Sequence, residues 1–361
     1  MDFHKLITRY KQFGGMRLVT EYAKLGVVPT VMRGLWRFTF KGSWFKVGAF
    51  QCSKELYGEV IRKVEPFLVE KYGTQIPQIV QKVRKNNHNH NDASTPSTSS
   101  DSGSATIWWC WLQGKKLAPA IVQACYNSLV HDEWLTVHGY EVKVIDNENW
   151  REYVELPGYI VEKWEKGRIP AAMFSDLLRV ELLIKYGGTW IDSTVLCTGI
   201  KEFNGLSSSS YSSSSPSVQE FKKYLDADLF LFQYTKQGSI PVSISNWFIS
   251  AHSNNEVLMV LREMLYAYWK DYDCMLDYYI FHLYFAMISK EYPEQIAAMP
   301  YGQSQNSLVL LYHWGEKFEQ KKWDKLTSQV CFHKLAFGVE KALTENPDNY
   351  YSKIISEYGN I

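Results

Sequence analysis

Residues 175–195 constrain the fold of this chain most, because their pattern changes from helix to strand at a pair of glycines. The first half, SDLLRVELLIK, is apolar on almost every side, which is typical of a buried helix. Asp176 and Arg179 interrupt this apolar surface three residues apart, so they share one face of the helix. Gly187 and Gly188 then end the helical pattern.

The charges on this helix need a physical reason. A buried carboxylate and a buried guanidinium cost free energy unless they are paired with each other or bound to a ligand. The helix alone leaves both explanations open. The strand that follows favours a binding site, because its alternation places Trp190, Asp192 and Thr194 on one side.

The segment before this stretch has the pattern of an α/β protein. An apolar run at 107–114, a helical pattern at 119–129 and a second strand pattern at 140–145 follow one another with short connections. This order predicts a parallel sheet. Ligands of such sheets bind at the carboxyl ends of the strands. The polar residues expected at those ends are Gln113, Asp146 and Asp192.

The 361 residues divide at a polar stretch that follows the first 86 residues. Residues 1–86 are predicted to form a helical, basic region, and residues 87–105 a flexible polar linker without large apolar side chains. Residues 106–361 are predicted to form the main domain, with a Ser-rich loop at 206–218. The first 50 residues carry nine Lys or Arg against two acidic residues, interleaved with Trp and Phe. This mixture fits a segment that lies on an anionic membrane surface, but a helical cap with a solvated basic face is the commoner explanation.

Charge and hydropathy restrict the class of protein. The net charge of +1 argues against a nucleic-acid-binding protein. The six cysteines have no metal-ligand or redox spacing. We found no signal-peptide pattern and no apolar run of about 18 residues. A cytoplasmic protein is therefore expected, with peripheral association at the inner face of the membrane.

Several motifs in order carry a family resemblance. IWWCWLQG, SDLLRVELLIKYGGTWIDSTV, ISNWFISA, LDYYIFH and FHKL follow one another over most of the main domain. This series resembles the capsular polysaccharide synthesis glycosyltransferases. They are part of a larger set of retaining transferases that includes the clostridial glucosylating toxins. The resemblance implies a GT-A fold, a Rossmann-like α/β nucleotide-sugar-binding domain with a DXD-type motif.

The resemblance also implies roles at matching positions. An aromatic ring at Trp111 would stack on the base of the nucleotide, and a guanidinium at Arg179 would bind hydroxyl or phosphate oxygens. The positions matched to catalysis are Asp176, Arg179 and Asp277. The positions matched to binding of the nucleotide-sugar donor are Trp111, Gln113, Gly188, Asp192, Asn246, His333 and Lys334.

A divalent cation, Mn²⁺ or Mg²⁺, is the cofactor that the resemblance implies. Its matched ligands are Asp192, Thr194 and His333. Thr194 departs from the motif of the larger set, which has a second aspartate there, and a neutral hydroxyl is a poorer ligand than a carboxylate. The metal could be held by the remaining groups, or the cationic side chains could replace it.

The resemblance therefore implies an enzyme that moves a hexose from a nucleotide sugar, such as a UDP-sugar, to a saccharide or lipid-linked saccharide acceptor. The expected context is synthesis of capsular or surface polysaccharide, with retention at the anomeric carbon. Two alternatives stay open. One is a nucleotide-sugar- or carbohydrate-binding module without catalysis, and the other is a sugar-phosphate transferase.

Overall fold

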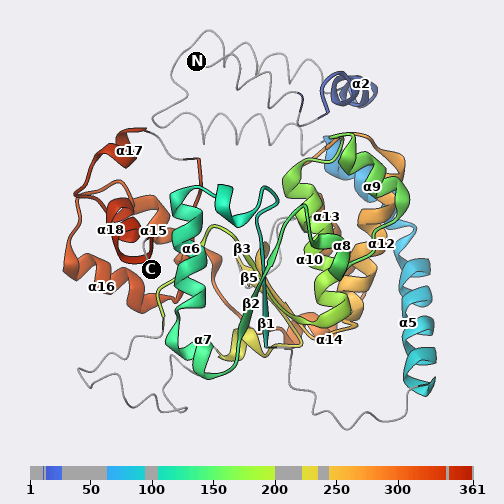
Figure 1. The fold of residues 1–361 in the computed structure, drawn as a ribbon. Helices are drawn as coiled ribbons and strands as arrows, with labels where there is room; N and C mark the ends of the chain where they lie inside the picture. The colour runs from blue at the N-terminus through green and yellow to red at the C-terminus, as the bar shows by residue number, and fades with distance from the viewer. Residues whose placement is uncertain are drawn as a thin grey trace. The chain divides into compact units, whose positions relative to one another are not determined.

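The computed structural model describes residues 11, 14–26, 63–93, 105–199, 222–234, 244–338 and 341–359. The chain forms two compact units (Figure 1). Unit 1 comprises Met1–Asp92, Glu155–Leu177 and Val260–Glu291, and unit 2 comprises Ala93–Val154, Leu178–Met259 and Tyr292–Ile361. The helices α10 (Ala171–Tyr186) and α12 (Glu256–Asp271) contribute residues to both units.

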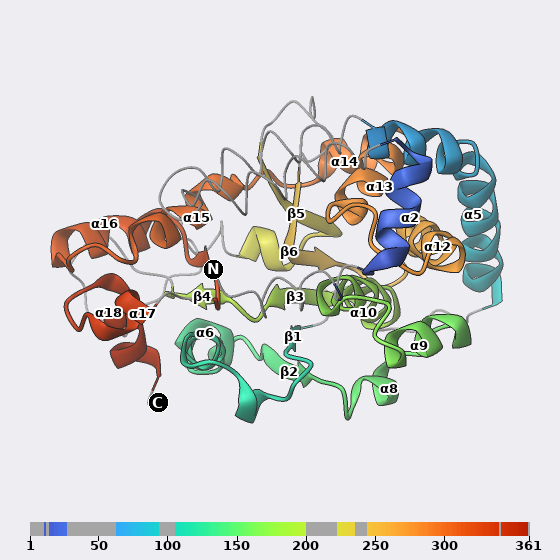
Figure 2. The ribbon, with the colours of Figure 1, turned by 90° about the horizontal axis from the view of Figure 1, so that it is seen from above.

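Unit 2 is built on a five-stranded sheet with the strand order β2-β1-β3-β6-β5 (Figures 1 and 2). Strands β2, β1 and β3 are parallel, and β6 is antiparallel to both β3 and β5. The strand bounds are β1 Thr106–Cys110, β2 Glu141–Ile145, β3 Gly188–Asp192, β5 Leu229–Gln233 and β6 Ile244–Ala251. The sheet is thus mixed and mostly parallel, which confirms the α/β class and is compatible with a Rossmann-like fold.

Helices cover this sheet because its inner strands β1, β3 and β6 are buried on both faces along most of their length. In β1, four of five residues are buried. The helix α6 (Ala120–Val130) begins after Pro119 and packs on β4 (Val195–Cys197) and on α18 (Tyr350–Tyr358). Further helices in the described part of unit 2 are η2 Lys115–Leu117, α7 Glu133–Val137, α8 Trp150–Tyr153, residues 222–225, α14 Pro293–Ala298, α15 Ser304–His313, α16 Gln320–Gln329 and α17 Lys341–Glu345.

The turn between α10 and β3 depends on Gly187. Its φ of +67° lies in the left-handed region, and a Cβ there would stand 2.9 Å from the backbone nitrogen of Ser253. The carbonyl oxygen of Gly187 accepts a hydrogen bond of 2.9 Å from the indole N–H of Trp108. A glycine is therefore required where the buried helix turns into the central strand.

A second sheet, of two strands, begins directly after β3. The strand β3 ends at Asp192, residues 193 and 194 form a turn, and β4 then pairs antiparallel with β7 (Phe332–Lys334). Thr194 therefore lies in a turn and not in the same strand as Asp192. Sequence alternation missed this change because pairing with a distant strand, and not local pattern, decides where β3 ends.

Unit 1 is helical in the residues that the structure describes. It contains α2 (Met16–Lys24), helical residues 63–73, α5 (Ile76–Ala93), α9 (Gly158–Glu165), α13 (Ile280–Ile288) and the adjoining parts of α10 and α12. The helix α13 begins at Ile280, after a turn that contains Asp277. The Asp277 carboxylate accepts a 2.7 Å hydrogen bond from the backbone N–H of Tyr279 and holds the turn there.

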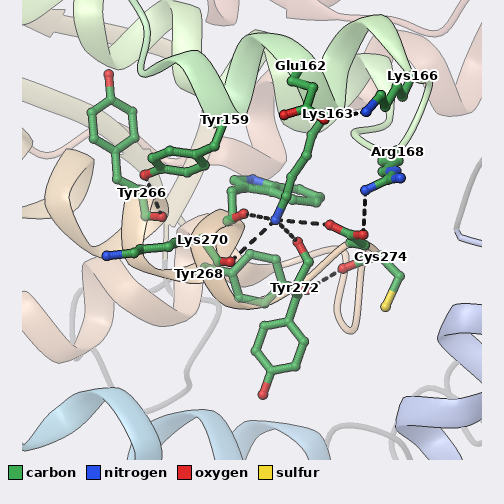
Figure 3. A network of polar contacts seen from close by, with 12 residues as sticks. Tyr159, Glu162, Lys163, Lys166, Arg168, Tyr266, Tyr268, Lys270, Tyr272 and Cys274 are labelled. Atoms are coloured by element: carbon green, nitrogen blue, oxygen red, sulfur yellow. Dashed lines mark hydrogen bonds and ion pairs between the residues drawn. The ribbon is translucent and has the colours of Figure 1, made fainter.

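The end of α12 is held by a lysine from α9 (Figure 3). The Lys163 ammonium donates to the carbonyl oxygens of Trp269 and Tyr272, the latter at 3.0 Å. It also forms a 3.0 Å ion pair with Asp273, whose other oxygen lies 2.7 Å from Arg168. A cation at the carboxyl end of a helix is favourable because the last carbonyl groups have no partner within the helix.

The boundaries differ from those expected from composition. The helix α5 continues to Ala93, and unit 1 gathers three separate segments of the chain. The predicted linker therefore begins as helix, while residues 94–104 lie outside the described residues. The Ser-rich loop at 206–218 and most of the basic region at 1–62 also lie outside them.

Candidate functional site

Several predicted site residues meet at one edge of the sheet in unit 2. Cys110, the last residue of β1, is in register with Ile145 of β2 and with Asp192 of β3, so the three parallel strands end together. The antiparallel strand β6 begins at this same edge, with Asn246 near its amino end. This edge is where parallel α/β sheets bind their ligands.

Asp192 lies at the centre of this edge. One carboxylate oxygen accepts a 2.9 Å hydrogen bond from the indole N–H of Trp190 and lies 3.4 Å from the Arg179 guanidinium. The other oxygen lies 3.2 Å from the Lys334 ammonium. Burial acts to raise the pKa of Asp192, but the charges of Lys334 and Arg179 outweigh it and hold the pKa below its ordinary value. The carboxylate is therefore ionised at neutral pH.

Strand pairing brings Lys334 to this position. Lys334 is opposite Val195 in the register of β4 and β7. The backbone N–H of Leu335 donates a 2.8 Å hydrogen bond to the carbonyl oxygen of Thr194. The Lys334 ammonium also donates to the Thr194 hydroxyl, so it bridges Thr194 and Asp192.

Arg179 reaches the edge from α10. Its guanidinium lies 4.8 Å from the centre of the Trp190 ring and donates to the carbonyl oxygen of Asn246. Only 5% of its side chain is exposed, compared with 24% for Asp192. The helix, β3 and β6 are therefore joined through one buried cation.

His333 lies on the other side of β7 from Lys334, because adjacent residues of a strand point to opposite faces. It is 1% exposed. Its ring Nε2 forms a 3.1 Å hydrogen bond with the hydroxyl of Thr198. The structure does not bring His333 to Asp192, and its contacts hold β7 against the segment after β4.

Trp111 follows β1 at the same edge and is partly exposed. Its ring meets the Phe337 ring edge to face, with centroids 5.3 Å apart. Gln113 is exposed in the turn after β1. Gly188, in contrast, begins β3 and lies at the opposite end of that strand from Asp192.

Two predicted catalytic residues belong to unit 1. Asp176 is 3% exposed on α10, one turn before Arg179 on that helix. Asp277 is also 3% exposed and accepts the N–H of Tyr279. A further acid, Glu65, is buried near Asp277. Burial and the charge of Asp277 raise the pKa of Glu65 to about 7.

The expected metal ligands fit a divalent cation poorly. Both oxygens of Asp192 and the hydroxyl of Thr194 already contact side-chain nitrogen donors, including Lys334 at both residues. His333 faces away from them. Within the described ranges, no three His, Cys, Asp or Glu side chains converge in a way that could hold a metal ion.

Comparison with known families gives the site its context. A family model described as capsular polysaccharide synthesis protein matches residues 47–354. The chain belongs to this family. No curated protein matches the chain. Membership indicates a role in capsular polysaccharide synthesis.

Three features of the chain were not identified from the sequence. The indole N–H of Trp190 orients Asp192, Phe337 packs on Trp111, and Glu65 is buried near Asp277. Only the first had a local signal, since alternation placed Trp190 and Asp192 on one side.

Among the helices of the described segments, none has the length and apolar character needed to cross a bilayer.

Proposed function

We propose that the chain is a glycosyltransferase that moves a hexose from a nucleotide sugar, such as a UDP-sugar, to a saccharide or lipid-linked saccharide acceptor. The observation that carries this proposal is the pairing of Asp192 with Arg179 and Lys334 at the carboxyl edge of the sheet. Family membership supports the context of capsule synthesis.

The charges at this edge suit a nucleoside diphosphate. Arg179 and Lys334 supply two cations, while Asp192 can accept hydrogen bonds from ribose or sugar hydroxyls. Trp111, supported by Phe337, offers an aromatic surface for the base. Asn246 and Gln113 add polar groups near the same edge.

The proposed chemistry is stabilisation of the leaving group. The bond between the anomeric carbon and the diphosphate oxygen breaks, and its electron pair stays on that oxygen. The hydroxyl oxygen of the acceptor forms the new bond from the same face, and its proton passes to the departing diphosphate. Cations fixed in a poorly solvated site favour this separation of charge, because they need no reorganisation during the reaction. Attack from the same face gives retention.

A panel of nucleotide sugars tests the proposal. Release of nucleoside diphosphate and the mass of the product are measured with saccharide and lipid-linked acceptors. Turnover is expected for the wild type and for Lys222→Ala, an exposed lysine outside the site, with a loss of at least 100-fold in Asp192→Asn and Arg179→Gln.

The outcomes separate the alternatives. Calorimetric binding of nucleotide sugar without product would indicate a binding module. A product that carries the phosphate would indicate a sugar-phosphate transferase. Full turnover in both folded site variants would refute the placement of the site.

We also propose that the basic N-terminal region binds anionic membrane surfaces. In its described part, α2 places Arg17 and Lys24 beside a partly covered apolar side, and none of its residues is buried. Co-sedimentation with vesicles of phosphatidylglycerol should weaken as salt rises. Equal sedimentation with neutral vesicles would contradict this proposal.

A further inference from the structure

We propose that the Lys334 ammonium takes the place of the divalent cation, so that nucleotide-sugar binding and transfer proceed without a metal ion. This inference rests on the proposed glycosyltransferase function, which it deepens by naming the source of positive charge. Two observations support it: the contacts of Lys334, and the poor fit of the expected metal ligands to a divalent cation.

The ammonium occupies the position that a cation would need. It lies 3.2 Å from one oxygen of Asp192 and contacts the hydroxyl of Thr194, the two residues of the motif that face this edge. A divalent ion bound by both residues would have to displace Lys334 or lie beside its charge. Repulsion between like charges at such a distance opposes metal binding.

The other atoms expected to bind the metal do not offset this repulsion. The second oxygen of Asp192 accepts from Trp190 and lies 3.4 Å from Arg179. His333, on the opposite face of β7, is hydrogen-bonded to Thr198. Mg²⁺ and Mn²⁺ prefer several oxygen ligands in a regular arrangement, and one carboxylate shared among three nitrogen donors does not supply it.

The backbone fixes Lys334 in this position. The pairing of β4 with β7 sets its register, and Leu335 bonds to the carbonyl oxygen of the same Thr194 whose hydroxyl the ammonium contacts. The side chain is 22% exposed, so the ammonium is partly desolvated yet open to a ligand. A positioned, partly desolvated cation stabilises a developing phosphate charge more than a mobile surface lysine does.

Thr194, which stands where the motif of the larger set has a second aspartate, is consistent with a lysine in place of the metal ion. A second carboxylate there would lie beside Asp192 and require a divalent ion or a further cation to balance it. Thr194 instead accepts a hydrogen bond from the ammonium and adds no charge. Asp192 then has two cationic neighbours, Arg179 and Lys334, and both are available to a diphosphate bound at this edge.

Nucleotide binding tests this inference directly. UDP and GDP are titrated by calorimetry into the wild type, Lys334→Met and Lys334→Arg, each in EDTA and in Mn²⁺. The wild-type Kd is expected to agree within about threefold in the two buffers, and Lys334→Met should weaken binding at least tenfold. Lys334→Arg should recover part of that loss. Lys222→Met, an exposed lysine in the same unit, is the matched control and should bind as the wild type does.

Binding of free Mn²⁺, followed by electron paramagnetic resonance, provides a second readout. The wild type should not bind the ion, whereas Lys334→Asp, which places a second carboxylate beside Asp192, should gain binding. Thermal unfolding identifies variants that fail to fold, and Lys334→Met remains the deciding variant if Lys334→Asp is one of them.

Two results would overturn the inference and are distinguishable. Tenfold tighter nucleotide binding in Mn²⁺, or turnover abolished by EDTA and restored by Mn²⁺, would show a metal-dependent enzyme and leave the proposed function intact. Absence of binding and of turnover in both buffers for every nucleotide sugar would refute the proposed function and the inference with it.

Discussion

The charge cluster at Asp192 predicts a measurable coupling between Asp192 and Lys334. Asp192→Asn keeps the shape of the side chain but leaves two partly or fully buried cations without their anion. At 3.2 Å and 3.4 Å, and an effective dielectric constant of about 20, each attraction amounts to about 5 kcal/mol before desolvation is subtracted. Breaking such a pair costs about 3 kcal/mol net, so we expect a loss of this order in the free energy of unfolding.

A double-mutant cycle isolates the contribution of the pair. Lys334→Met removes one cation, so Asp192→Asn should cost less in that background, with a coupling energy of about 1–3 kcal/mol. Urea unfolding at pH 7, followed by tryptophan fluorescence and circular dichroism, gives the four stabilities. The control cycle uses Lys222 and Asp226, an exposed pair at 3.9 Å, for which coupling below about 0.5 kcal/mol is expected.

The pH dependence of the same cycle has a defined sign. The pKa of Asp192 in the folded protein lies below its ordinary value of 3.8, so the stabilisation is fully present above that pH. It should disappear as the pH falls through the lowered pKa. Coupling equal to that of the control pair at pH 7, or coupling that grows on acidification, would refute the electrostatic account.

Three further predictions concern other parts of the chain. Glu65→Gln should stabilise the protein by roughly 2–3 kcal/mol at pH 8 and little below pH 4.5, because the folded protein holds the Glu65 proton up to a pKa of about 7. Lys163→Met should lower the free energy of unfolding by about 2 kcal/mol, because it removes the cation at the end of α12. Gly187→Ala should cost about 2–4 kcal/mol, because its φ of +67° and the nearby backbone leave no room for a methyl group.

Matched variants check the first two of these. Glu70→Gln changes an exposed acid in the same helical stretch and should show no comparable gain with rising pH. Lys166→Met removes an exposed ion pair from α9 and should cost much less than Lys163→Met. A Glu65→Gln gain that is equal at pH 4 and pH 8, or equal losses for the two lysines, would contradict the assigned causes. If Gly187→Ala left the free energy of unfolding in urea unchanged, the steric argument for Gly187 would be wrong.

Local patterns predicted the first two strands of the sheet and the helix between them. The strand patterns at 107–114 and 140–145 correspond to β1 and β2, and the helical pattern at 119–129 corresponds to α6. The strand β1 is buried on both faces, β2 is partly buried, and α6 is buried on its apolar side, so burial and local pattern agree. The division into units was not predictable, because unit 1 gathers segments separated by more than 60 residues, and no composition shift marks the ends of the second and third segments.

In the candidate site too, local sequence determined some features and the tertiary structure decided others. Residues 175–195 by themselves determined that a buried helix bearing Arg179 turns at glycine into a strand bearing Asp192, because these features follow from spacing and backbone freedom. Only the tertiary structure decided that Lys334 bridges Asp192 and Thr194 while its neighbour His333 faces away. That outcome depends on the register between β4 and β7, which lie far apart in the chain, and a shift of one residue would exchange the two side chains.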